Sequence, residues 1–314
     1  MSDTARLLDD ALDRLLRRQL PDAMARNASD LPDTLMAKMI EAGFTLVLAG
    51  EENGGLGGSL TDAACVAWRC GWHATPLPIV EMLLLPVLDL PGDPSRISLA
   101  HGNLATAPIL KTTQSIRIGN GSENRTVAAD KAHSFRSIPD AQWCRLENTD
   151  ANHDDAIMTM GALLTTAAMT GAMARIMEIA IDHVETRSQF GRPLKKFQAI
   201  QHQLAEATSE LTITEAALAS ALDAHDAGKG RLLLSNSAKA QAGVAATKIA
   251  ATAHQVLGAI GFTEEHELHH FTKKLWQWRD SWGRQIDCDL AIGRAACAAP
   301  DGLWAYITNE KESA

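Results

Sequence analysis

Residues 187–194 read Arg-Ser-Gln-Phe-Gly-Arg-Pro-Leu, stand at the end of a long helical pattern and lead into Phe197-Gln198. Arg187 carries a fixed positive charge on a planar fork that suits a pyrophosphate. Gly191, close to the helix end, lets an anion approach without crowding by a side chain. The alternative is that Arg187 only stabilises the carboxyl end of its helix, where a cation is favourable against the helix dipole.

Residues 254–262, His-Gln-Val-Leu-Gly-Ala-Ile-Gly-Phe, form a second segment of this kind. Gln255 offers amide donors and acceptors, and Gly258 permits close approach of the backbone to a ligand. The alternative is that Gly258 and Gly261 simply turn the chain at a helix end. Two such segments in one chain favour a bound cofactor over two unrelated turns.

The pattern along the chain predicts a mainly α fold in three parts. Residues 1–90 are expected to form an N-terminal helical domain. Residues 91–153 contain short β-rich pieces separated by Gly, Asn, Pro and Ser, which predicts a small β segment. Residues 154–314 return to long helical patterns rich in Ala, Met and Leu, for which a four-helix bundle is the simplest architecture.

Three local signals specify the N-terminal helices further. A leucine face is expected on the first helix, a second helix is expected to run from about Thr34 and stop at Gly43, and Ser59 is a plausible N-cap of a helix through Trp72. The leucines at helical spacing are Leu7, Leu8, Leu12, Leu15 and Leu16. The loop 54–58 could cradle a phosphate, but without a following Lys-Ser or Lys-Thr it is better explained as a connection between helices.

Composition restricts the class of protein. With 314 residues, 46% of them hydrophobic and 21% charged, the chain is expected to be globular. The net charge of −9 argues against a nucleic-acid binder, which needs clustered Lys and Arg. The five cysteines include no Cys-x-x-Cys pair, so a reducing cytoplasm is expected. The start of the chain reads as an amphipathic helix, and no membrane span is expected.

The two segments closely resemble signatures of the acyl-CoA dehydrogenase family, R-x-Q-F-G-x-P-L leading to F-Q and H-Q-x-L-G-G-x-G-F. The order of Gly43-Phe44, the loop 54–58 and the next helix is similar to the N-terminal helical domain of that family, so the likeness extends over most of the chain. The resemblance implies FAD as cofactor. The residues implied to bind it are Arg187, Gln189, Phe190, Phe197, Gln198, Gln255, Val256, Leu257, Gly258 and Ala259.

The residue that performs the family's chemistry is missing at both expected positions. Acyl-CoA dehydrogenases remove the α-proton of the thioester with a carboxylate while the flavin accepts a hydride. The usual Glu before a glycine corresponds to Trp282, and the alternative position on the first bundle helix corresponds to Gly161, followed by Ala162 in place of an arginine. No catalytic residue is therefore assigned. Asp280 is the nearest carboxylate and a candidate for a displaced base.

The β segment is also shorter than in the family and lacks its T-E-P-x-x-G-S-D motif, so it offers no clear binding surface for the flavin ring. In the homotetramers that the chain resembles, the two segments grip the ADP half of FAD across a subunit interface. The resemblance therefore implies a companion subunit, at least dimeric, that completes the FAD site of a homologous full-length partner. Heterotetrameric relatives of this kind act on bulky, steroid-like acyl-CoA thioesters.

Several alternatives stay open. The chain could be a self-sufficient flavoenzyme that uses Asp280 or another carboxylate, or a non-enzymatic protein on a decayed scaffold. Residues 266–270, His-Glu-Leu-His-His, satisfy H-E-x-x-H, which on a helix would point two imidazoles toward a zinc ion and suggest a hydrolase, although no metal site is assigned. The tryptophans Trp276, Trp278 and Trp282 could form a wall beside a cofactor, or belong to the core.

Overall fold

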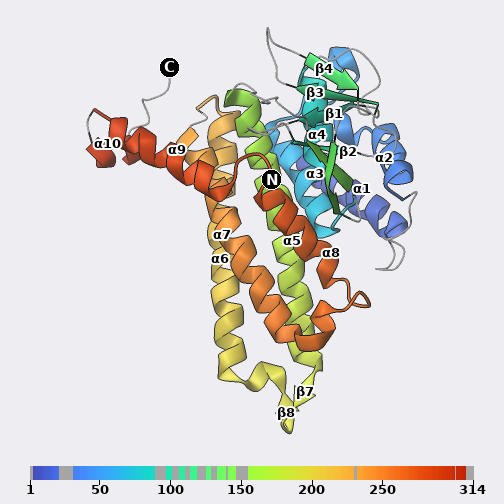
Figure 1. The fold of residues 1–314 in the computed structure, drawn as a ribbon, viewed down its shortest axis with the longest axis vertical. Coiled ribbons are helices and arrows are strands. Elements are labelled where there is room, and N and C mark those ends of the chain that lie inside the picture. The colour runs from blue at the N-terminus through green and yellow to red at the C-terminus, as the bar shows by residue number, and fades with distance from the viewer. Residues whose placement is uncertain are drawn as a thin grey trace.

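Four antiparallel helices form the bundle that was predicted for the C-terminal part of the chain (Figure 1). They are α5 (Asp155–Thr186), α6 (Gln198–Asp226), α7 (Leu232–Leu257) and α8 (Leu268–Arg279). The structure, a computed structural model, describes residues 3–20, 31–88, 97–100, 106–109, 114–118, 125–128, 133–138, 141–145, 155–229, 232–300 and 302–308. Helices α9 (Gln285–Ala298) and α10 (Gly302–Thr308) extend sideways from the bundle.

The N-terminal helices are α1 (Asp3–Gln19), α2 (Leu31–Glu41), α3 (Leu60–Trp72) and α4 (Ile79–Leu84), with short 3-10 helices at Phe44–Leu46, Glu51–Asn53 and Leu85–Leu88. Of these helices, α3 and α4 pack against the upper half of α5, and α1 packs against α3. Ser59 caps α3 as predicted: its Oγ accepts from the Asp62 N–H at 3.1 Å, and Asp62 Oδ2 accepts from the Ser59 N–H at 3.0 Å. Residues 54–58 connect helices, as expected of a loop.

One helix boundary and one helix face differ from the prediction. Helix α2 already begins at Leu31 rather than near Thr34, but it ends at Glu41 and the chain leaves it through Gly43 in the left-handed region (φ 78°), in line with the predicted stop. In α1, Leu12 and Leu16 are fully buried, whereas Leu7 is 68% exposed. Placing Leu7 on the buried face was therefore wrong, because the contact with α3 follows a narrower stripe than the leucine pattern suggests.

Short strands make up the predicted β segment at the upper end of the molecule. They are β1 (Ile97–Ala100), β2 (Thr106–Ile109), β3 (Ser115–Ile118), β4 (Arg125–Ala128), β5 (His133–Ile138) and β6 (Ala141–Arg145). Strand β3 pairs parallel with β1 and antiparallel with β4, while β6 lies between β2 and β5 in a second, antiparallel sheet.

One hydrophobic core continues from the N-terminal helices into the bundle. Helices α3 and α5 approach so closely that a methyl group on Gly71 would overlap the carbonyl of Ala168, and one on Gly171 would overlap the carbonyl of Trp68. A second link joins the two parts, since Asp226 at the end of α6 accepts from the N–H groups of Leu60 and Thr61 at 3.0 and 3.1 Å. The carboxylate thus satisfies free donors at the start of α3.

Helix α5 is the central element of this core. Among the described residues it is the one helix long and apolar enough, by length and composition, to cross a membrane. Most of its apolar stretch is buried against α3, α6, α7 and α8, so its composition is that of a core helix surrounded by protein.

The contact of α3 with α5 predicts a strong effect of one methyl group. We expect Gly171→Ala to lower the free energy of unfolding by about 3 kcal/mol or more, because rigid backbone must move to admit the methyl. Gly293→Ala on α9 is the matched control: a methyl there meets no atom within 4 Å, so helix propensity alone should raise stability by about 0.5–1 kcal/mol. Urea unfolding followed by circular dichroism measures both, and equal stability of the two variants would contradict the close contact.

Candidate functional site

A β-hairpin at the lower tip of the bundle carries the first predicted segment (Figure 1). Strands β7 (Ser188–Gln189) and β8 (Arg192–Pro193) pair antiparallel, with Gln189 opposite Arg192. The turn residues Phe190 and Gly191 both have positive φ, 53° and 78°. Two-residue turns of this kind favour Asn-Gly, and a bulky residue in the left-handed region is strained.

The ring of Phe190 is held out into solvent, where it is 91% exposed. Its described aromatic contact is an edge-to-face arrangement with Phe197, 6.3 Å between ring centroids. The Arg192 guanidinium lies 4.0 Å from the centroid of the Phe197 ring. Strained backbone under an exposed aromatic ring is typical of a binding surface rather than of a structural turn.

Arg187 stands where α5 passes into this hairpin. Its N–H donates to the His183 carbonyl at 2.9 Å, and its own carbonyl accepts from the Leu194 N–H at 2.9 Å. Leu194 is buried and anchors the hairpin to the bundle, whereas Arg187, Gln189 and Gln198 are exposed. The guanidinium and the amides are therefore open to a ligand.

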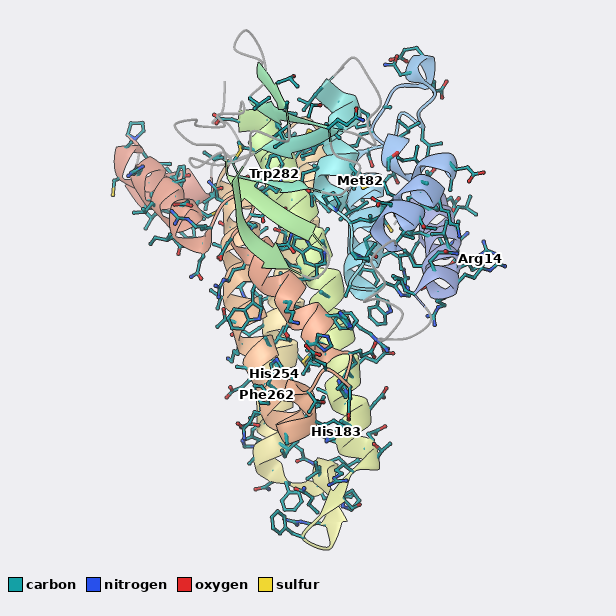
Figure 2. All side chains as sticks on the ribbon, turned by 45° about the vertical axis from the view of Figure 1, so that its right-hand side comes forward. Arg14, Met82, His183, His254, Phe262 and Trp282 are labelled. Atoms are coloured by element: carbon teal, nitrogen blue, oxygen red, sulfur yellow. The ribbon has the colours of Figure 1, made fainter. Side chains whose placement is uncertain are left out.

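The second predicted segment lies at the same end of the bundle, where α7 ends and the 3-10 helix Gly258–Phe262 begins (Figures 1 and 2). Gln255 and Ala259 are exposed, but the side chains of Val256 and Leu257 are buried in the core. These last two could therefore reach a cofactor only through their main-chain groups.

His254 fixes the shape of this turn. Its ring stacks on Phe262 at 4.6 Å between centroids, and its Nε2 lies 3.3 Å from Thr272 Oγ1. Burial lowers the pKa of His254, so the ring is neutral at physiological pH. Gly258, at φ 65°, adopts the left-handed conformation that the turn requires, and a side chain there would meet open space.

The two segments predicted to bind FAD, 187–198 and 254–262, lie at the opposite end of the molecule from the β segment (Figure 1). Helix α5 separates them, and its 32 residues span about 48 Å. A cofactor bound at the hairpin cannot also rest on β1–β4 of the same chain. The structure thus places the exposed polar residues of both segments at one end of the bundle and this chain's own strands at the other.

The two positions predicted to correspond to the family's base touch each other at the upper end of the bundle. Trp282 is buried in the turn after α8, and its indole packs on Gly161 so closely that a methyl at Gly161 would overlap the ring carbon Cε3. The indole Nε1–H donates to Glu81 Oε1 at 3.1 Å. Figure 2 shows Trp282 in this upper region, far from His254 and Phe262.

Sequence reasoning missed Glu81, a buried carboxylate of α4. The available signal was one acidic residue inside the apolar run Ile79–Leu85. A carboxylate in such a run is costly unless it is hydrogen-bonded, which here the indole helps to provide.

A buried lysine holds the turn that carries Trp282. Lys239 of α7 is fully buried, and its Nζ donates to the carbonyls of Arg279 at 3.1 Å and Gly283 at 2.7 Å. These carbonyls lie on either side of Trp282, which itself has a positive φ of 52°. Burial lowers the pKa of Lys239 to about 8.

Asp280 points elsewhere. Its carboxylate is about half exposed, pairs with Arg279 at 3.3 Å, and lines a surface pocket of about 390 Å³ with Arg284 and Asp289. Glu81, rather than Asp280, is the carboxylate that accepts from the Trp282 indole. A catalytic role for Asp280 therefore stays a prediction.

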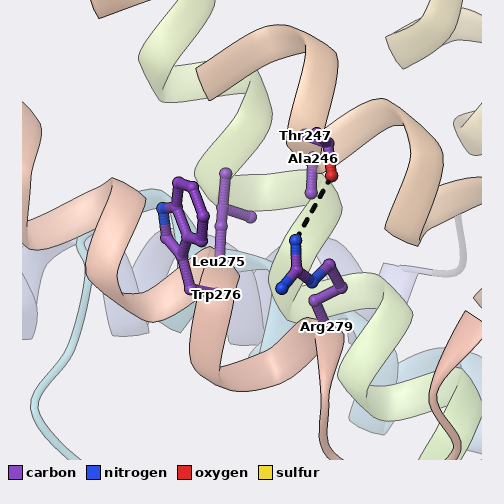
Figure 3. A pocket seen from close by; sticks show the side chains of 5 residues that line it. All are labelled: Ala246, Thr247, Leu275, Trp276 and Arg279. Carbon is purple, nitrogen blue, oxygen red and sulfur yellow. Dashed lines mark hydrogen bonds between the residues drawn. The ribbon is translucent and has the colours of Figure 1, made fainter. Parts of the chain in front are cut away.

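Trp276, Trp278 and Trp282 do not form a common wall. Trp278 and Trp282 are buried, while Trp276 is partly exposed beside a pocket of only about 10 Å³ (Figure 3). There Arg279 stacks over the Trp276 ring at 5.3 Å and donates to Thr247 Oγ1 at 3.5 Å. That volume admits no more than about one water molecule.

The zinc alternative does not fit the geometry. His266 precedes α8, and its Nδ1 accepts from the Leu268 N–H at 3.1 Å, so the two histidines of H-E-x-x-H do not share one helical face. Glu267 pairs with Arg175 at 3.0 Å. Within the part of the chain that the structure describes, no cluster of three His, Cys, Asp or Glu could hold a metal ion.

Comparison with known proteins supports the likeness. Residues 155–275 match the family model for the acyl-CoA dehydrogenase C-terminal domain. The chain is 28% identical over 257 residues to acyl-CoA dehydrogenase IpdE2 of Mycobacterium tuberculosis, covering 74% of this chain and 77% of the relative. The fold is similar to the ChsE4–ChsE5 complex of M. tuberculosis, with a TM-score of 0.80 and 19% identity over 96% of this chain and 99% of that chain.

A second solved structure, the Tcur3481–Tcur3483 steroid ACAD, is similar with a TM-score of 0.74 and 19% identity over 92% of this chain and 96% of the other. The resemblance to this family and the fold class predicted from the pattern along the chain are thereby confirmed.

The lowered pKa of Lys239 makes the free energy of unfolding depend on pH. Since the pKa of Lys239 is lowered from 10.5 to about 8 in the folded chain, the unfolded chain binds more protons between these values. Burying the charged ammonium group costs stability. Above pH 10.5 the lysine is neutral in both states and this cost is absent; as the pH falls through 8 the cost is reached in full and the stability is lost. We expect the free energy of unfolding of the wild type, relative to Lys239→Met, to rise by about 2 kcal/mol from about pH 7.5 to about pH 10.

Urea titrations across this range measure the difference. Lys273→Met, which removes an exposed lysine of α8, is the control and should track the wild type at every pH. Parallel curves for the wild type and Lys239→Met would contradict the assignment.

Proposed function

We propose that this chain, whose residues 155–275 match the model of the acyl-CoA dehydrogenase C-terminal domain, is the companion subunit of a homologous, full-length acyl-CoA dehydrogenase. Its hairpin end grips the ADP half of an FAD whose flavin ring rests on the partner. The assembly, at least a dimer, desaturates an acyl-CoA thioester between its α and β carbons. Steroid-like acyl groups are the proposed substrates, in line with the steroid ACAD among the similar structures.

One observation carries the proposal: Trp282 packs on Gly161, so both positions expected for the family's base are filled without a carboxylate, while Arg187, Gln189, Gln198 and Gln255 are exposed at the end of α5 away from this chain's own β segment. A grip that faces away from its own chain suits a ligand held mainly by another subunit. Complexes of two different chains also occur among the similar structures, as in ChsE4–ChsE5.

The chemistry of the exposed residues fits the ADP half of FAD. Arg187 offers a fork for a pyrophosphate, and Gln189, Gln198 and Gln255 offer amide groups for the polar edges of an adenosine. Phe190 presents a free aromatic face, which suits stacking on a flat base. Side chains at Gly191 and Gly258 would meet open space, so backbone groups there are accessible to a ligand.

When bound, FAD supplies the hydride acceptor of the reaction. This chain contributes binding and orientation of the cofactor, while the proton-abstracting carboxylate belongs to the partner, because Trp282 and Gly161 occupy the corresponding positions here. We place the assembly in the cytoplasm, where free thiols such as those of Cys65, Cys70, Cys288 and Cys297 persist.

A self-sufficient flavoenzyme is the second candidate, because Glu81 is a buried carboxylate hydrogen-bonded to Trp282, one of the two expected base positions. It requires that the lone chain bind flavin. Absorbance in the flavin bands of the purified single chain separates the two candidates.

Reconstitution with a longer homologue tests whether this chain binds FAD and supports desaturation only together with a partner. The lone chain should carry little FAD and desaturate nothing, and the co-expressed pair should gain both. In the pair, Arg187→Gln should weaken FAD binding about 10- to 100-fold, the effect of losing charge-assisted hydrogen bonds to phosphate. Arg14→Gln, on the distant α1, is the control and should leave FAD affinity unchanged. Full flavin occupancy and turnover by the lone chain would refute the companion role.

A second variant separates function from stability. Phe190→Asn places a residue that tolerates positive φ at the strained turn position, so the isolated chain should keep its stability or gain up to about 1 kcal/mol. The same variant removes the exposed ring and should reduce FAD retention by the pair about tenfold. Thermal unfolding and equilibrium dialysis of FAD measure the two effects; a loss of stability without a loss of FAD would assign Phe190 to the fold instead.

A further inference from the structure

Helices α9 and α10, which extend sideways from the bundle (Figure 1), present an apolar side to solvent. All 14 residues of α9 and all seven of α10 are described, and of these only Cys288 is buried. Isolated helices this short are marginal in water, so we expect their apolar side to be covered by protein. The large exposed side chains, between 47% and 78% exposed, are Ile286, Leu290, Leu303, Trp304 and Ile307.

Four residues of α9 form one stripe along the exposed side. The intervals between them are four, three and four residues, the spacing that places side chains on one face of a helix. Cys288 lies on the opposite side, near Lys239 of α7, on which α9 packs. The stripe therefore faces away from the chain's own bundle, and it consists of Ile286, Leu290, Gly293 and Cys297.

We propose that this stripe pairs with the same stripe of a second copy of the chain, in antiparallel orientation, with the twofold axis passing beside Leu290. The pairing goes beyond the FAD role and does not depend on it. The stripe lies apart from the hairpin at the lower tip of the bundle, so a second copy bound here leaves that tip open to the full-length partner (Figure 1). A pair of this chain thus presents two such tips.

Gly293 selects the antiparallel orientation. A methyl added there would meet no atom of the chain within 4 Å, so the stripe has a shallow gap at this position. In an antiparallel pair centred beside Leu290, the gap of each copy receives Ile286 and Leu290 of the other copy. A parallel pair would instead set glycine against glycine and leave a void, which close-packed interfaces avoid.

Two charges on one flank of the stripe match this orientation. Asp287 and Arg294 are seven residues apart, close to two helical turns, and therefore lie on the same flank. In an antiparallel pair with twofold symmetry, each flank meets the same flank of the other copy in reverse order, so Arg294 of each copy faces Asp287 of the other. The midpoint of the two positions falls beside Leu290, the axis that the apolar packing also requires.

Both charged groups can make this contact. Arg294 is exposed and has no ion pair among the described residues. The Asp287 carboxylate accepts from Arg284 at 2.8 and 2.9 Å, is 44% exposed, and has room for further donors. Asp289, the remaining charge on the exposed side, lines the pocket beside Arg279 and Arg284 of its own chain. The flank of Asp287 and Arg294 is thus the one left to bind a second copy.

Sedimentation of the lone chain tests the contact. The wild type should form a dimer, and Leu290→Asp should raise its dissociation constant at least about 100-fold, because both copies lose a buried leucine. Leu7→Asp on the distant α1 is the matched control: it changes another exposed leucine and should leave the dimer unchanged. Both variants should keep the circular dichroism of the wild type. A monomeric wild type, or a Leu290→Asp dimer as tight as that of the wild type, would overturn the proposal.

Charge exchange tests the orientation. Arg294→Glu and Asp287→Lys should each weaken the dimer at least about tenfold, because like charges then meet twice across the axis. An equimolar mixture should regain wild-type affinity within about threefold, since the mixed dimer contains one native pair and one reversed pair. Loss of the Arg284 contact in Asp287→Lys persists in the mixture, so the recovery reports only on the contact between copies. A mixture that pairs no better than the separate variants is incompatible with the antiparallel contact.

Disulfide trapping locates the axis independently. Leu290→Cys, combined with Cys297→Ser, should form a disulfide between copies under mild oxidation, because the two residues at position 290 lie across the axis within disulfide reach. In the wild-type dimer the two exposed Cys297 residues lie about 20 Å apart along the helices, at 1.5 Å per residue, and should stay reduced. A Cys297 disulfide in the wild type would reveal parallel helices and refute the proposed pairing.

Discussion

Helices α3 and α5 meet backbone to backbone at Gly71 and Gly171, and the relative position of the two halves of the molecule depends on this contact. With any larger residue at either position the helices would separate, and α4, which follows α3, would move away from the bundle. Glu81 then could not reach Trp282 across the core. The Asp226 cap on α3 acts in the same direction, because it ties the end of α6 to the start of the same helix.

A layer of charged and aromatic side chains covers the outer side of this contact. Arg69 pairs with Asp9 and Asp13 of α1, and its guanidinium also lies over the stacked rings of Trp68 and Trp72. His73 binds Asp13 at 2.8 Å, so α1 is fastened to α3 by partly buried polar contacts as well as by Leu12 and Leu16. Such pairs fix orientation, while the apolar contact supplies most of the stabilisation.

Local signals in the sequence predicted local features well. The Ser59 cap and the helices of the bundle follow from residues close together in the chain, because caps and helical periodicity act over one or two turns. The cofactor role of the two segments stays a prediction. The roles of Glu81 and Lys239 could not be predicted in this way. Each partner lies tens of residues away or more, and nothing near Glu81 in the apolar run Ile79–Leu85 marks its pairing with Trp282. Leu7 shows the converse: a correct helical period did not reveal how wide the buried stripe would be.

The exposed tip of the bundle has a consequence for how such a subunit is made. Phe190 and Phe262 are 91% and 73% exposed at the end that the proposed partner covers. Ile260, which belongs to the second segment, is also exposed. An orphan copy would present this apolar tip to chaperones and proteases until a partner arrived. We therefore expect balanced synthesis of the two chains to matter for the cell, since surplus copies of this one would be degraded or aggregate rather than wait in solution.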